Sequence, residues 1–417
     1  MSSKKVLVSI SLGNDTIRVG ILWFNIRKGR ESASFEYDST WLQHPEKFAL
    51  EPSLRLTEGL FYTQDGMSAF NAIGDSAPDR WGRVLMRRAE LARAKSKNST
   101  PLTLFEGDYL LGVNDEARQG ALRFSMGPQE TLFLKPQEER AIPPLVSLPH
   151  LLVATERFIQ DEENAEDLRL LLAPGSSLGG ARPKASVRDR DGSLAIAKFP
   201  KKDDDYAVVL WEAVALTLAK KAGITVPQWR LETILEKPVL IIKRFDREKG
   251  QRIPFLSALS MLGARDNEQH SYIEIAYALA QYGAAPEQDM EELWRRIVFT
   301  IAISNTDDHL RNHGFLYERY KGWRLSPVYD INPTPIEMKA RVLTTAIDFE
   351  DTSASLEIAR AVAKDFRISS HKAQEIINQV GYAVSHWRDS ASHVGLSKRE
   401  CDRMASAFEH EDSITLK

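Results

Sequence analysis

The sequence predicts a mixed α+β fold with a β-rich beginning and a mostly helical end. Three observations lead to this class. The first residues alternate between apolar and polar, helices and strand-like runs then follow one another without a regular βαβ rhythm, and beyond about residue 255 apolar residues recur at helical spacing. We therefore expect three regions, 1–147, 148–255 and 256–417, rather than a doubly wound parallel sheet.

Composition narrows the possible environments and partners. The 417 residues carry 55 Lys and Arg against 58 Asp and Glu, a net charge of −3, so no global basic field favours nucleic acid or an anionic membrane as the main partner. The single Cys401 excludes an intramolecular disulfide and a zinc site of several cysteines. Without a signal-like start or an apolar run of roughly 20 residues, we expect a cytoplasmic protein that does not cross a membrane.

The N-terminal region opens with a predicted hairpin. In VLVSISLGNDTIRVGILWF the alternating residues flank the turn-forming cluster Gly13-Asn14-Asp15. Further on, Asp75 and Ser76 can cap a helix that Pro78 opens, and its arginines are typical of a solvated face. The segment 124–147 is rich in Pro and polar residues, which predicts a linker or an extended arm.

The middle region alternates helices and strands. A helix is expected from about residue 148 in LPHLLVATERFIQD, followed by two strand-like runs, PKASVRD and SLAIAKF, that flank the turn dipeptide Asp191-Gly192. The stretch DYAVVLWEAVALTLAKKAGI has helical apolar spacing and stops at Gly223, and KPVLIIKRFDR is typical of a buried strand.

Helical periodicity dominates the last region. EQDMEELWRRIVFTIAIS has one apolar face, formed by Met290, Leu293, Ile297 and Ile301. Between about 353 and 410, three further amphipathic segments predict a small helical bundle: SLEIARAVAKDF, AQEIINQVGYAV and SKRECDRMASAF.

The first stretch that indicates chemistry is GSSLGGARPK, residues 175–184. Its glycines and serines allow backbone N–H groups to turn inward, as a phosphate-binding loop requires. The stretch matches neither the Walker A pattern nor GxGxxG, so a surface loop without a ligand remains the competing interpretation.

A second candidate is Lys198 in the apolar run SLAIAKFP. It could protect an edge strand from pairing, or it could contact nucleotide phosphates while paired with Glu212 of the following helix. The competing interpretation of Glu212 is a solvated helix position.

The third stretch, NTDDHLRNHG, spans Asn305 to Gly314 directly after an apolar helix. Asp307 and Asn312 are five residues apart, and Asp330 follows 23 residues after Asp307 in LSPVYDINP, which we expect to be a short strand and a Pro-bearing turn. Phosphoryl transfer needs a carboxylate that accepts the proton of the attacking hydroxyl, and an amide oxygen and a second carboxylate that hold Mg²⁺. This order and spacing match the catalytic loop and metal-binding Asp of protein kinases, whereas a capped helix end would explain one or two of the groups.

The histidines of this stretch allow other interpretations. His309 and His313, with Asp307 or Asp308, could ligate zinc or iron, but histidines four apart need a continuous helix, which Asn312 and Gly314 disfavour. We favour a role for His309 in bracing the loop through hydrogen bonds to backbone carbonyls. A hydrolytic triad is weakly supported because no GxSxG elbow is present.

Taken together, these motifs resemble the HipA-like serine/threonine kinases, the toxins of bacterial toxin–antitoxin modules. The resemblance extends over GSSLGGARPKA, AIAKFP, IIKRFDR, ISNTDDHLRNHGF and SPVYDINP, and in the N-terminal half over IGDSAPDRWGR and YLLGVNDEARQGALRF. It implies a protein-kinase-like two-lobe architecture: an N-terminal subdomain (1–147), a kinase N-lobe-like region with the phosphate loop (148–255) and a helical C-lobe with the catalytic and metal-binding motifs (256–417).

The resemblance also implies roles for single residues. Asp307 would be the catalytic base, Asn312 and Asp330 the Mg²⁺ ligands, and Glu212 a supporting residue. Lys243 stands where a member of the family carries an acidic residue, so contacts to adenine are expected to differ there. Ser177 matches the autophosphorylated serine of the family, with Ser176 as a competing acceptor. The implied ATP-binding residues are Lys198, Ser177, Leu178, Gly179, Gly180, Ala181, Lys243, Phe245 and His309.

The implied function is an ATP- and Mg²⁺-dependent serine/threonine protein kinase that inhibits translation by phosphorylating an aminoacyl-tRNA synthetase or a similar target. Autophosphorylation of the Gly-rich loop would switch it off, because the added charge repels ATP. The implied partner is a helix-turn-helix antitoxin of the HipB type, through which DNA would be contacted indirectly. Two alternatives remain: a catalytically silent corepressor scaffold, and a kinase for a small molecule. By spacing, Asp308 is expected to be a solvated neighbour of the base or a loop brace.

Overall fold

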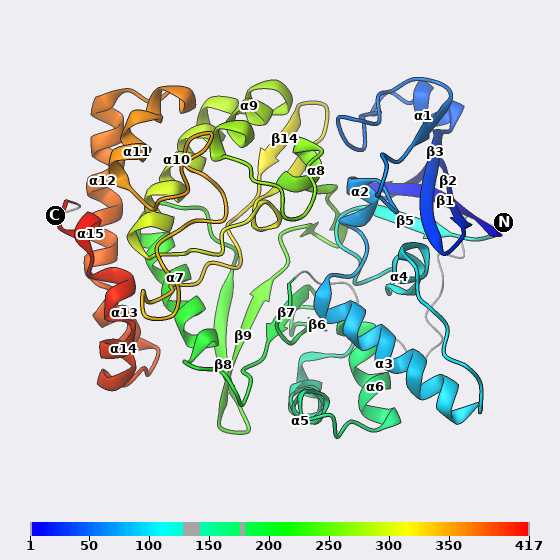
Figure 1. Ribbon diagram of the computed structural model, residues 1–417, viewed down its shortest axis with the longest axis horizontal. Helices are drawn as coiled ribbons and strands as arrows, with labels where there is room; N and C mark the ends of the chain where they lie inside the picture. Colours follow the sequence, from blue (N-terminus) through cyan, green and yellow to red (C-terminus); the bar gives the residue numbers. More distant parts are fainter. Residues whose placement is uncertain (1, 128–141, 176–179, 416–417) are drawn as a thin grey trace. The chain divides into compact units, whose positions relative to one another are not determined.

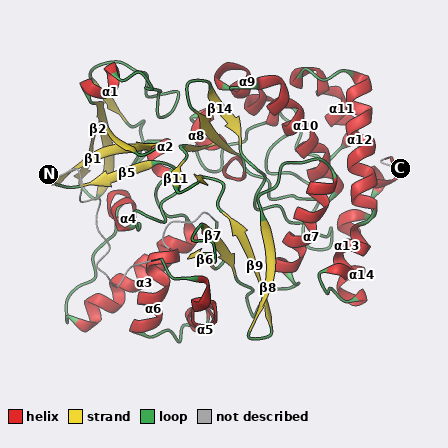
Figure 2. Cartoon of the chain, turned by 180° about the vertical axis from the view of Figure 1, so that it is seen from behind, coloured by secondary structure: helices red, strands yellow, loops and turns green. Residues whose placement is uncertain are grey.

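A computed structural model describes residues 2–127, 142–175 and 180–415 of the chain. It divides into two compact units, each made of two chain segments: Met1–Lys202 with Glu232–Leu256, and Asp203–Leu231 with Ser257–Lys417. Strands gather in the first unit and helices in the second (Figures 1 and 2), which confirms the predicted α+β class with a β-rich N-terminal part and a helical C-terminal region. The division into 1–147, 148–255 and 256–417 stays a prediction.

The first unit begins with a five-stranded antiparallel sheet of order β4-β3-β2-β1-β5. Its strands are β1 (Ser2–Leu12), β2 (Asp15–Arg27), β3 (Arg30–Tyr37), β4 (Leu60–Tyr62) and β5 (Leu122–Ser125). Leu12 pairs with Asp15, so the chain turns at Gly13 and Asn14, and the predicted hairpin is confirmed. The short helices α1 (Ser39–Gln43), α2 (Asn71–Gly74) and α4 (Glu106–Gly112) lie between these strands in sequence.

Helix α3 (Arg80–Ser96) starts later than predicted. Its N-cap is Asp79, whose carboxylate accepts a hydrogen bond from the Arg80 N–H at 2.7 Å. Asp75 and Ser76 do not cap it, because their own N–H groups donate to carbonyls of α2 and so close that preceding helix. The predicted cap was therefore wrong: the two residues end α2 and do not begin α3.

A second sheet of order β6-β7-β9-β8 carries the other predicted hairpin. Its strands are β6 (Lys184–Arg188), β7 (Leu194–Lys198), β9 (Lys237–Lys243) and β8 (Trp229–Ile234), and the predicted turn at Asp191-Gly192 is confirmed. Helices α5 (Leu148–Ile159) and α6 (Ala165–Gly175) share one apolar core with α3 and this sheet, built from residues such as Trp81, Leu151, Phe158, Val187 and Ile241.

The first unit also contains three further short elements. They are the 3-10 turn η2 (Leu145–Ser147) and the strand pair β10 (Arg247–Glu248) and β11 (Gln251–Arg252). Of the predicted linker 124–147, residues 128–141 lie outside the described residues, and residues up to Ser125 belong to β5 instead, where Ser125 pairs with Leu7 of β1. Of the three boundaries between the two units, one follows Lys202, and the other two fall within β8 and β12 (Phe255–Ser257).

The second unit is mostly helical. Its helices are α7 (Val208–Lys221), α8 (Ala258–Leu262), α9 (Tyr272–Tyr282), α10 (Pro286–Ala302), α11 (Leu356–Ala361), α12 (Ser370–Ser385), α13 (Trp387–His393), α14 (Lys398–Phe408) and α15 (Glu411–Thr415), with the 3-10 turns η3 (Leu310–Asn312) and η4 (Ala363–Phe366). The predicted apolar face of α10 is fully buried, and α7 ends before Gly223, whose φ of +80° leaves the helical region. The predicted C-terminal helices are confirmed.

In sequence, the hairpin of β13 (Gly314–Glu318) and β14 (Gly322–Leu325) lies between Asp307 and Asp330. The strand predicted in LSPVYDINP ends at Leu325, earlier than expected. Pro327 has no N–H, so it cannot continue the ladder. Residues 326–329 therefore approach Asp330 as an irregular segment.

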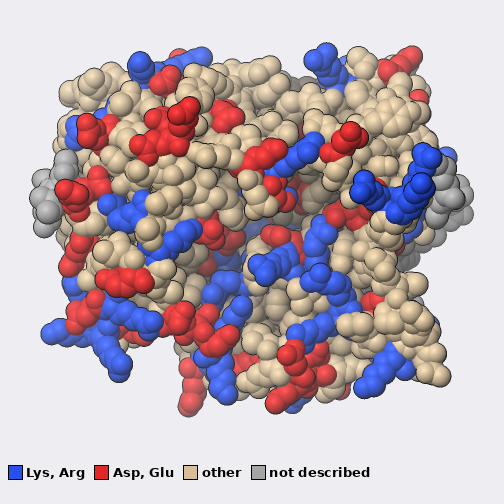
Figure 3. Space-filling view, viewed as in Figure 1, with Lys and Arg blue, Asp and Glu red and all other residues tan. Residues whose placement is uncertain are grey.

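The distribution of charge and the character of the helices can be compared with the composition. Basic and acidic side chains are mixed over the face seen in Figure 3. Within the described residues, no helix combines the length and apolar character that crossing a bilayer requires.

Candidate active site

The block after α10 reverses the chain within a few residues. Ser304 has a φ of +51°, which ends the helix, and Asn305 then closes the turn with its N–H on the Thr300 carbonyl at 3.0 Å. Asp307 is exposed, whereas Asp308 next to it is buried. The two adjacent carboxylates thus lie in different environments, and Asp307 is the one available to a substrate.

Asn312 is tied to the residue that we expect to be the base. Its side-chain N–H donates to the backbone carbonyl of Asp307 at 3.0 Å, and its backbone N–H donates to the carbonyl of His309 at 2.8 Å. The amide nitrogen is therefore used, and the side-chain oxygen of the buried Asn312 is the atom left for a cation.

Asp330 is brought back to this block by the β13–β14 hairpin. Phe315 pairs with Leu325, the Ser326 N–H donates to the Gly314 carbonyl at 2.8 Å, and the Tyr329 hydroxyl donates to the Arg311 carbonyl at 2.7 Å. Asp330 itself has a φ of +54°, a left-handed conformation that costs energy for most side chains. Asp is one of the few residue types besides Gly that adopt this conformation, so Asp330 suits the position.

The chemistry of these residues fits a hard cation such as Mg²⁺. Asp307, Asn312 and Asp330 offer oxygen donors, which Mg²⁺ prefers and usually complements with water and substrate phosphates. Several buried polar atoms of the same block make no hydrogen bond within the described part of the chain: Asn305 Nδ2, Thr306 Oγ1, His309 Nδ1 and Asn332 Oδ1. The block is thus a polar environment in which several buried atoms could still accept or donate a hydrogen bond.

The histidines do not form the zinc or iron site considered above. Among the described residues, no group of three or more His, Cys, Asp or Glu side chains is arranged to hold a metal. His309 donates a hydrogen bond from its backbone N–H to the Asp307 carbonyl at 3.0 Å, and its ring Nδ1 makes no hydrogen bond within the described residues. His313 is buried, and its Nε2 lies 3.2 Å from Asp308 Oδ1.

Asp308 is a brace and not a solvated neighbour. Its side chain is 5% exposed and accepts a 2.6 Å hydrogen bond from the Tyr272 hydroxyl. Burial alone would raise the pKa of the Asp308 carboxyl, but the adjacent His313 imidazole and the hydrogen bonds outweigh it and lower that pKa. Of the two expectations for Asp308, the solvated one was wrong.

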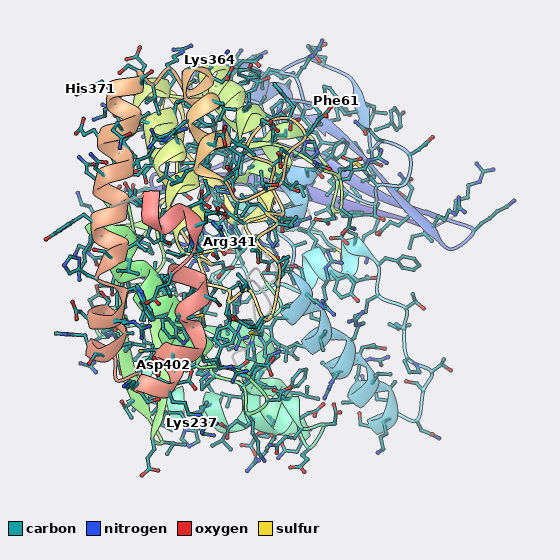
Figure 4. All side chains as sticks on the ribbon, turned by 60° about the vertical axis from the view of Figure 1, so that its left-hand side comes forward. Phe61, Lys237, Arg341, Lys364, His371 and Asp402 are labelled. Carbon is teal, nitrogen blue, oxygen red and sulfur yellow. The ribbon has the colours of Figure 1, made fainter. Side chains whose placement is uncertain are left out.

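A segment downstream of Asp330 fastens onto the same block. Lys339 Nζ and Thr344 Oγ1 both donate to the Thr306 carbonyl, at 3.1 and 3.0 Å. Arg341, labelled in Figure 4, donates to Ser304 Oγ at 3.2 Å and pairs with Asp412 at 2.8 Å. The sequence analysis missed these residues, because their partners are a backbone carbonyl and side chains distant in sequence that no motif marks.

Lys198 belongs to the first unit and ends β7, which lies between β6 and β9. The edge-strand interpretation was therefore wrong. Lys198 pairs in register with Lys184 of β6, and both residues are buried, 8% and 4% exposed. Lys184 was missed as a candidate, because a two-residue turn at Asp191-Gly192 would place Ala185 opposite Lys198, whereas the observed register is shifted by one residue.

The glycine-rich stretch is only partly described, because Ser176, Ser177, Leu178 and Gly179 lie outside the described residues. Gly180 has a φ of +85°, its N–H donates to the Asp79 carboxylate, and its carbonyl accepts from the Trp81 N–H at 3.2 Å. The Trp81 indole donates to the Lys184 carbonyl at 3.0 Å, and Ala181 is exposed. The start of α3, inside the IGDSAPDRWGR motif, therefore anchors the end of this loop.

Phe245 lies between two residues that form a buried ion pair. Arg244 Nη2 lies 2.5 Å from Asp246 Oδ2, and this carboxylate also accepts from the Gly120 N–H at 2.8 Å. Burial would raise the pKa of Asp246, but Arg244 and Arg247 hold it well below its usual range. Lys243 is partly exposed and pairs with Asp191 at 3.1 Å. The network fixes the backbone on both sides of Phe245.

Glu212 lies on α7 in the second unit and is 4% exposed. The interpretation as a solvated helix position was therefore wrong. Lys198 and Glu212 belong to different units, so their predicted pairing stays a prediction.

The comparison with known families decides the family. The profile of the HipA-like C-terminal domain matches residues 176–387, just over half of the chain and all of the block from Asp307 to Asp330. The chain belongs to the HipA-like family. The HipA-like match confirms the resemblance drawn from the motifs.

Individual relatives agree with the HipA-like assignment. A Haemophilus influenzae protein named "Putative kinase" is 30% identical over 189 residues, which cover 39% of this chain and 54% of that protein. A Sinorhizobium fredii protein, "Putative kinase Y4dM", is 26% identical over 164 residues, 36% of this chain and 39% of that protein. The chain thus spans about half or less of the length of these curated relatives.

The fold of a HipA structure matches nearly the whole chain. The structure of the Shewanella oneidensis HipA, HipB and operator DNA complex aligns with a TM-score of 0.61 and 16% identity, covering 98% of this chain and 95% of that one. At this identity the match shows a shared HipA fold.

Proposed function

We propose that this HipA-like chain is an ATP- and Mg²⁺-dependent serine/threonine protein kinase and the toxin of a toxin–antitoxin module. The observation that carries the proposal is the Asn312 side chain bonded to the Asp307 backbone, with the hairpin returning the strained Asp330 to the same block. A structural role alone does not require an exposed carboxylate, an anchored amide and a left-handed Asp in this order.

In this proposal Asp307 orients the acceptor hydroxyl and takes its proton. The acceptor oxygen forms a bond to the γ-phosphorus of ATP, the bond from that phosphorus to the β,γ-bridging oxygen breaks, and ADP leaves. The exposure of Asp307 suits a group that must meet a protein substrate, while its backbone is held by Asn312 and His309.

Asn312 and Asp330 would hold Mg²⁺ through side-chain oxygens. The bound cation would neutralise phosphate charge. In the first unit, Lys198 and Lys184 would provide two positive groups from facing strands for the phosphates, and Phe245 would line the adenine site. Lys243, His309 and Ala181 are further proposed ATP contacts, and Glu212 is proposed to support Lys198.

The proposed off switch is autophosphorylation of Ser177 or Ser176. A phosphate group adds about −1.5 to −2 charge at neutral pH, which would repel ATP from the loop. Asp79 and Trp81 hold Gly180, the first described residue after these serines.

The proposed partners are a helix-turn-helix antitoxin and a cytoplasmic protein target such as an aminoacyl-tRNA synthetase. The similar Shewanella fold was solved with HipB and operator DNA, which supports the antitoxin proposal. The same observation favours a second candidate, a silent corepressor. If Asp307→Ala represses the operator with the antitoxin as wild type does, and wild type transfers no phosphate, the corepressor function is favoured.

The test is phosphate transfer from labelled ATP with Mg²⁺. We expect wild type to incorporate label in the 176–177 segment and Asp307→Ala to incorporate none. Asp402→Ala removes an exposed carboxylate on α14 and should behave as wild type. Absence of both nucleotide binding and transfer in wild type would overturn the proposal. Comparing the phosphoproteomes of cells that express wild type and Asp307→Ala would identify the target, and phosphorylated metabolites without phosphoproteins would indicate a small-molecule kinase.

A further inference from the structure

Asp308 connects four separate segments of the second unit. Its Oδ2 accepts from the Tyr272 hydroxyl of α9 at 2.6 Å and from Thr300 Oγ1 of α10 at 3.3 Å. Its Oδ1 lies 3.2 Å from His313 Nε2, and its backbone carbonyl accepts from Thr345 Oγ1 at 2.6 Å. These partners offset the cost of burying the carboxylate, and they also tie separate segments to the residue next to Asp307.

The contacts of Asp308 form the second of two parallel cross-links in the loop. The first joins the Asn312 side chain to the Asp307 carbonyl, and the second joins the His313 side chain to Asp308. Both link residues five positions apart, and they start and end at consecutive residues. The pair therefore restrains the distance between the 307–308 peptide and the 312–313 peptide.

The second cross-link is itself held by a closed ring of hydrogen bonds. Tyr272 bonds Asp308 through its hydroxyl, and its backbone N–H donates to the Ala346 carbonyl at 2.9 Å. The neighbouring Thr345 returns to the Asp308 carbonyl. Tyr272 is fully buried, and its ring packs edge-on against His313 with centroids 5.5 Å apart. The cycle of hydrogen bonds leaves the side chain of Asp308 little freedom to move.

We propose that Asp308 is a positioning residue, whose buried carboxylate, held by Tyr272 and His313, sets the spacing between Asp307 and Asn312. This inference rests on the proposed kinase function of the same block. Asp308 does not touch substrate: it acts through the backbone it shares with Asp307 and through the cross-link next to Asn312. Buried, over-determined carboxylates of this kind keep a loop within the narrow geometry that catalysis needs.

Asp308→Asn tests the role, because it keeps the shape and removes the charge. We expect faster backbone hydrogen exchange in the 304–314 segment of the protein without nucleotide. We also expect kcat for phosphate transfer to fall on the order of tenfold to a hundredfold, with KM for ATP nearly unchanged. Tyr272→Phe should have a smaller effect of the same kind, and the double variant should lose less than the sum of both, because the two groups act as a unit.

Asp289→Asn is the matched control. Asp289 is an equally buried carboxylate of the second unit, bonded to Arg324 at 2.9 Å and to the Leu325 N–H at 3.0 Å. Its replacement should lower the melting temperature without changing exchange in 304–314 or kcat per folded molecule. An Asp308→Asn protein with unchanged exchange, or with faster exchange but unchanged kcat, would overturn the proposal. Since exchange is read without ATP, a wild type that transfers no phosphate would count against the kinase function alone.

Discussion

Lys184 and Lys198 face each other on the antiparallel strands β6 and β7, and both side chains are buried. Like charges directly opposite on a sheet are unfavourable to each other, so an anion bound beside both lysines would stabilise the pair. In the proposed kinase, the phosphates of ATP are that anion.

We therefore predict that Lys184→Met and Lys198→Met each lose most of the rise in melting temperature that ATP gives wild type, as weaker binding requires. The melting temperature without ATP shows any change in stability itself. Thermal melts with and without ATP and Mg²⁺ measure both quantities. Lys237→Met, which removes an exposed lysine on β9, is the control and should keep the full ATP response. An unchanged response in both buried variants would contradict the prediction.

Replacements of Asp330 should separate its backbone from its side chain. At a φ of +54°, Ala is expected to lose roughly 1–2 kcal/mol of stability, whereas Asn and Gly tolerate this conformation. All three should lose phosphate transfer, because each removes the carboxylate. Denaturant titration and labelled-ATP assays check the two effects. If Ala is as stable as Asn, the left-handed conformation is not required.

Asp79 should couple a helix cap to nucleotide binding. Asp79→Ala removes the cap of α3, at a cost of about 1 kcal/mol, and frees the Gly180 N–H. We expect a raised KM for ATP in addition to the lower stability. Asp38→Ala removes the corresponding cap of α1, where the carboxylate accepts from the Thr40 N–H at 3.0 Å, and should lower stability alone. Equal KM values in both variants would show that the Gly180 contact has no role in binding.

His410 should make the free energy of unfolding depend on pH in the mildly acidic range. Burial and the nearby Arg341 lower the pKa of the His410 imidazole to about 4, while its Nε2 bonds the Ala302 carbonyl at 3.3 Å. In the unfolded chain the ordinary pKa is about 6.5, so the unfolded state binds more protons between these values. Stability should fall as pH drops from about 6.5 to 4, by up to about 3 kcal/mol.

His410→Gln keeps an N–H donor but cannot titrate, so its stability should depend less on pH in that range. Urea titrations of both proteins at several pH values measure the difference. A slope in the variant equal to that of wild type would assign the pH dependence to other groups.

The local elements were largely predictable from the sequence. Hairpins at Gly13-Asn14 and at Asp191-Gly192 carry strong turn signals, and the apolar faces of α7 and α10 show helical spacing. The start of α3 was missed because two possible caps lie close together. Asp79 makes the capping bond and also accepts from the Gly180 N–H, while Asp75 closes the preceding helix, a difference that no local pattern marks.

The candidate site was predictable in its residue types but not in its supports. Spacing selected Asp307, Asn312 and Asp330. For Asp308 it left two possibilities open, a solvated neighbour of the base or a brace of the loop. The choice depends on Tyr272, 36 residues away in sequence, and on Thr345, 37 residues away. Such long-range partners have no signature in a single sequence, and the same holds for Lys339, Arg341 and Thr344.

The interleaving of the two units has a consequence for synthesis. The first unit needs residues 232–256 to complete it, and the second unit takes its first segment from residues 203–231. A ribosome must therefore deliver most of the chain before either unit has all its strands and helices, and domain-by-domain folding during translation is restricted. For the same reason, a simple truncation cannot release either unit intact, so a catalytic fragment would have to be made by replacing the intervening segment with a linker or by co-expressing two pieces.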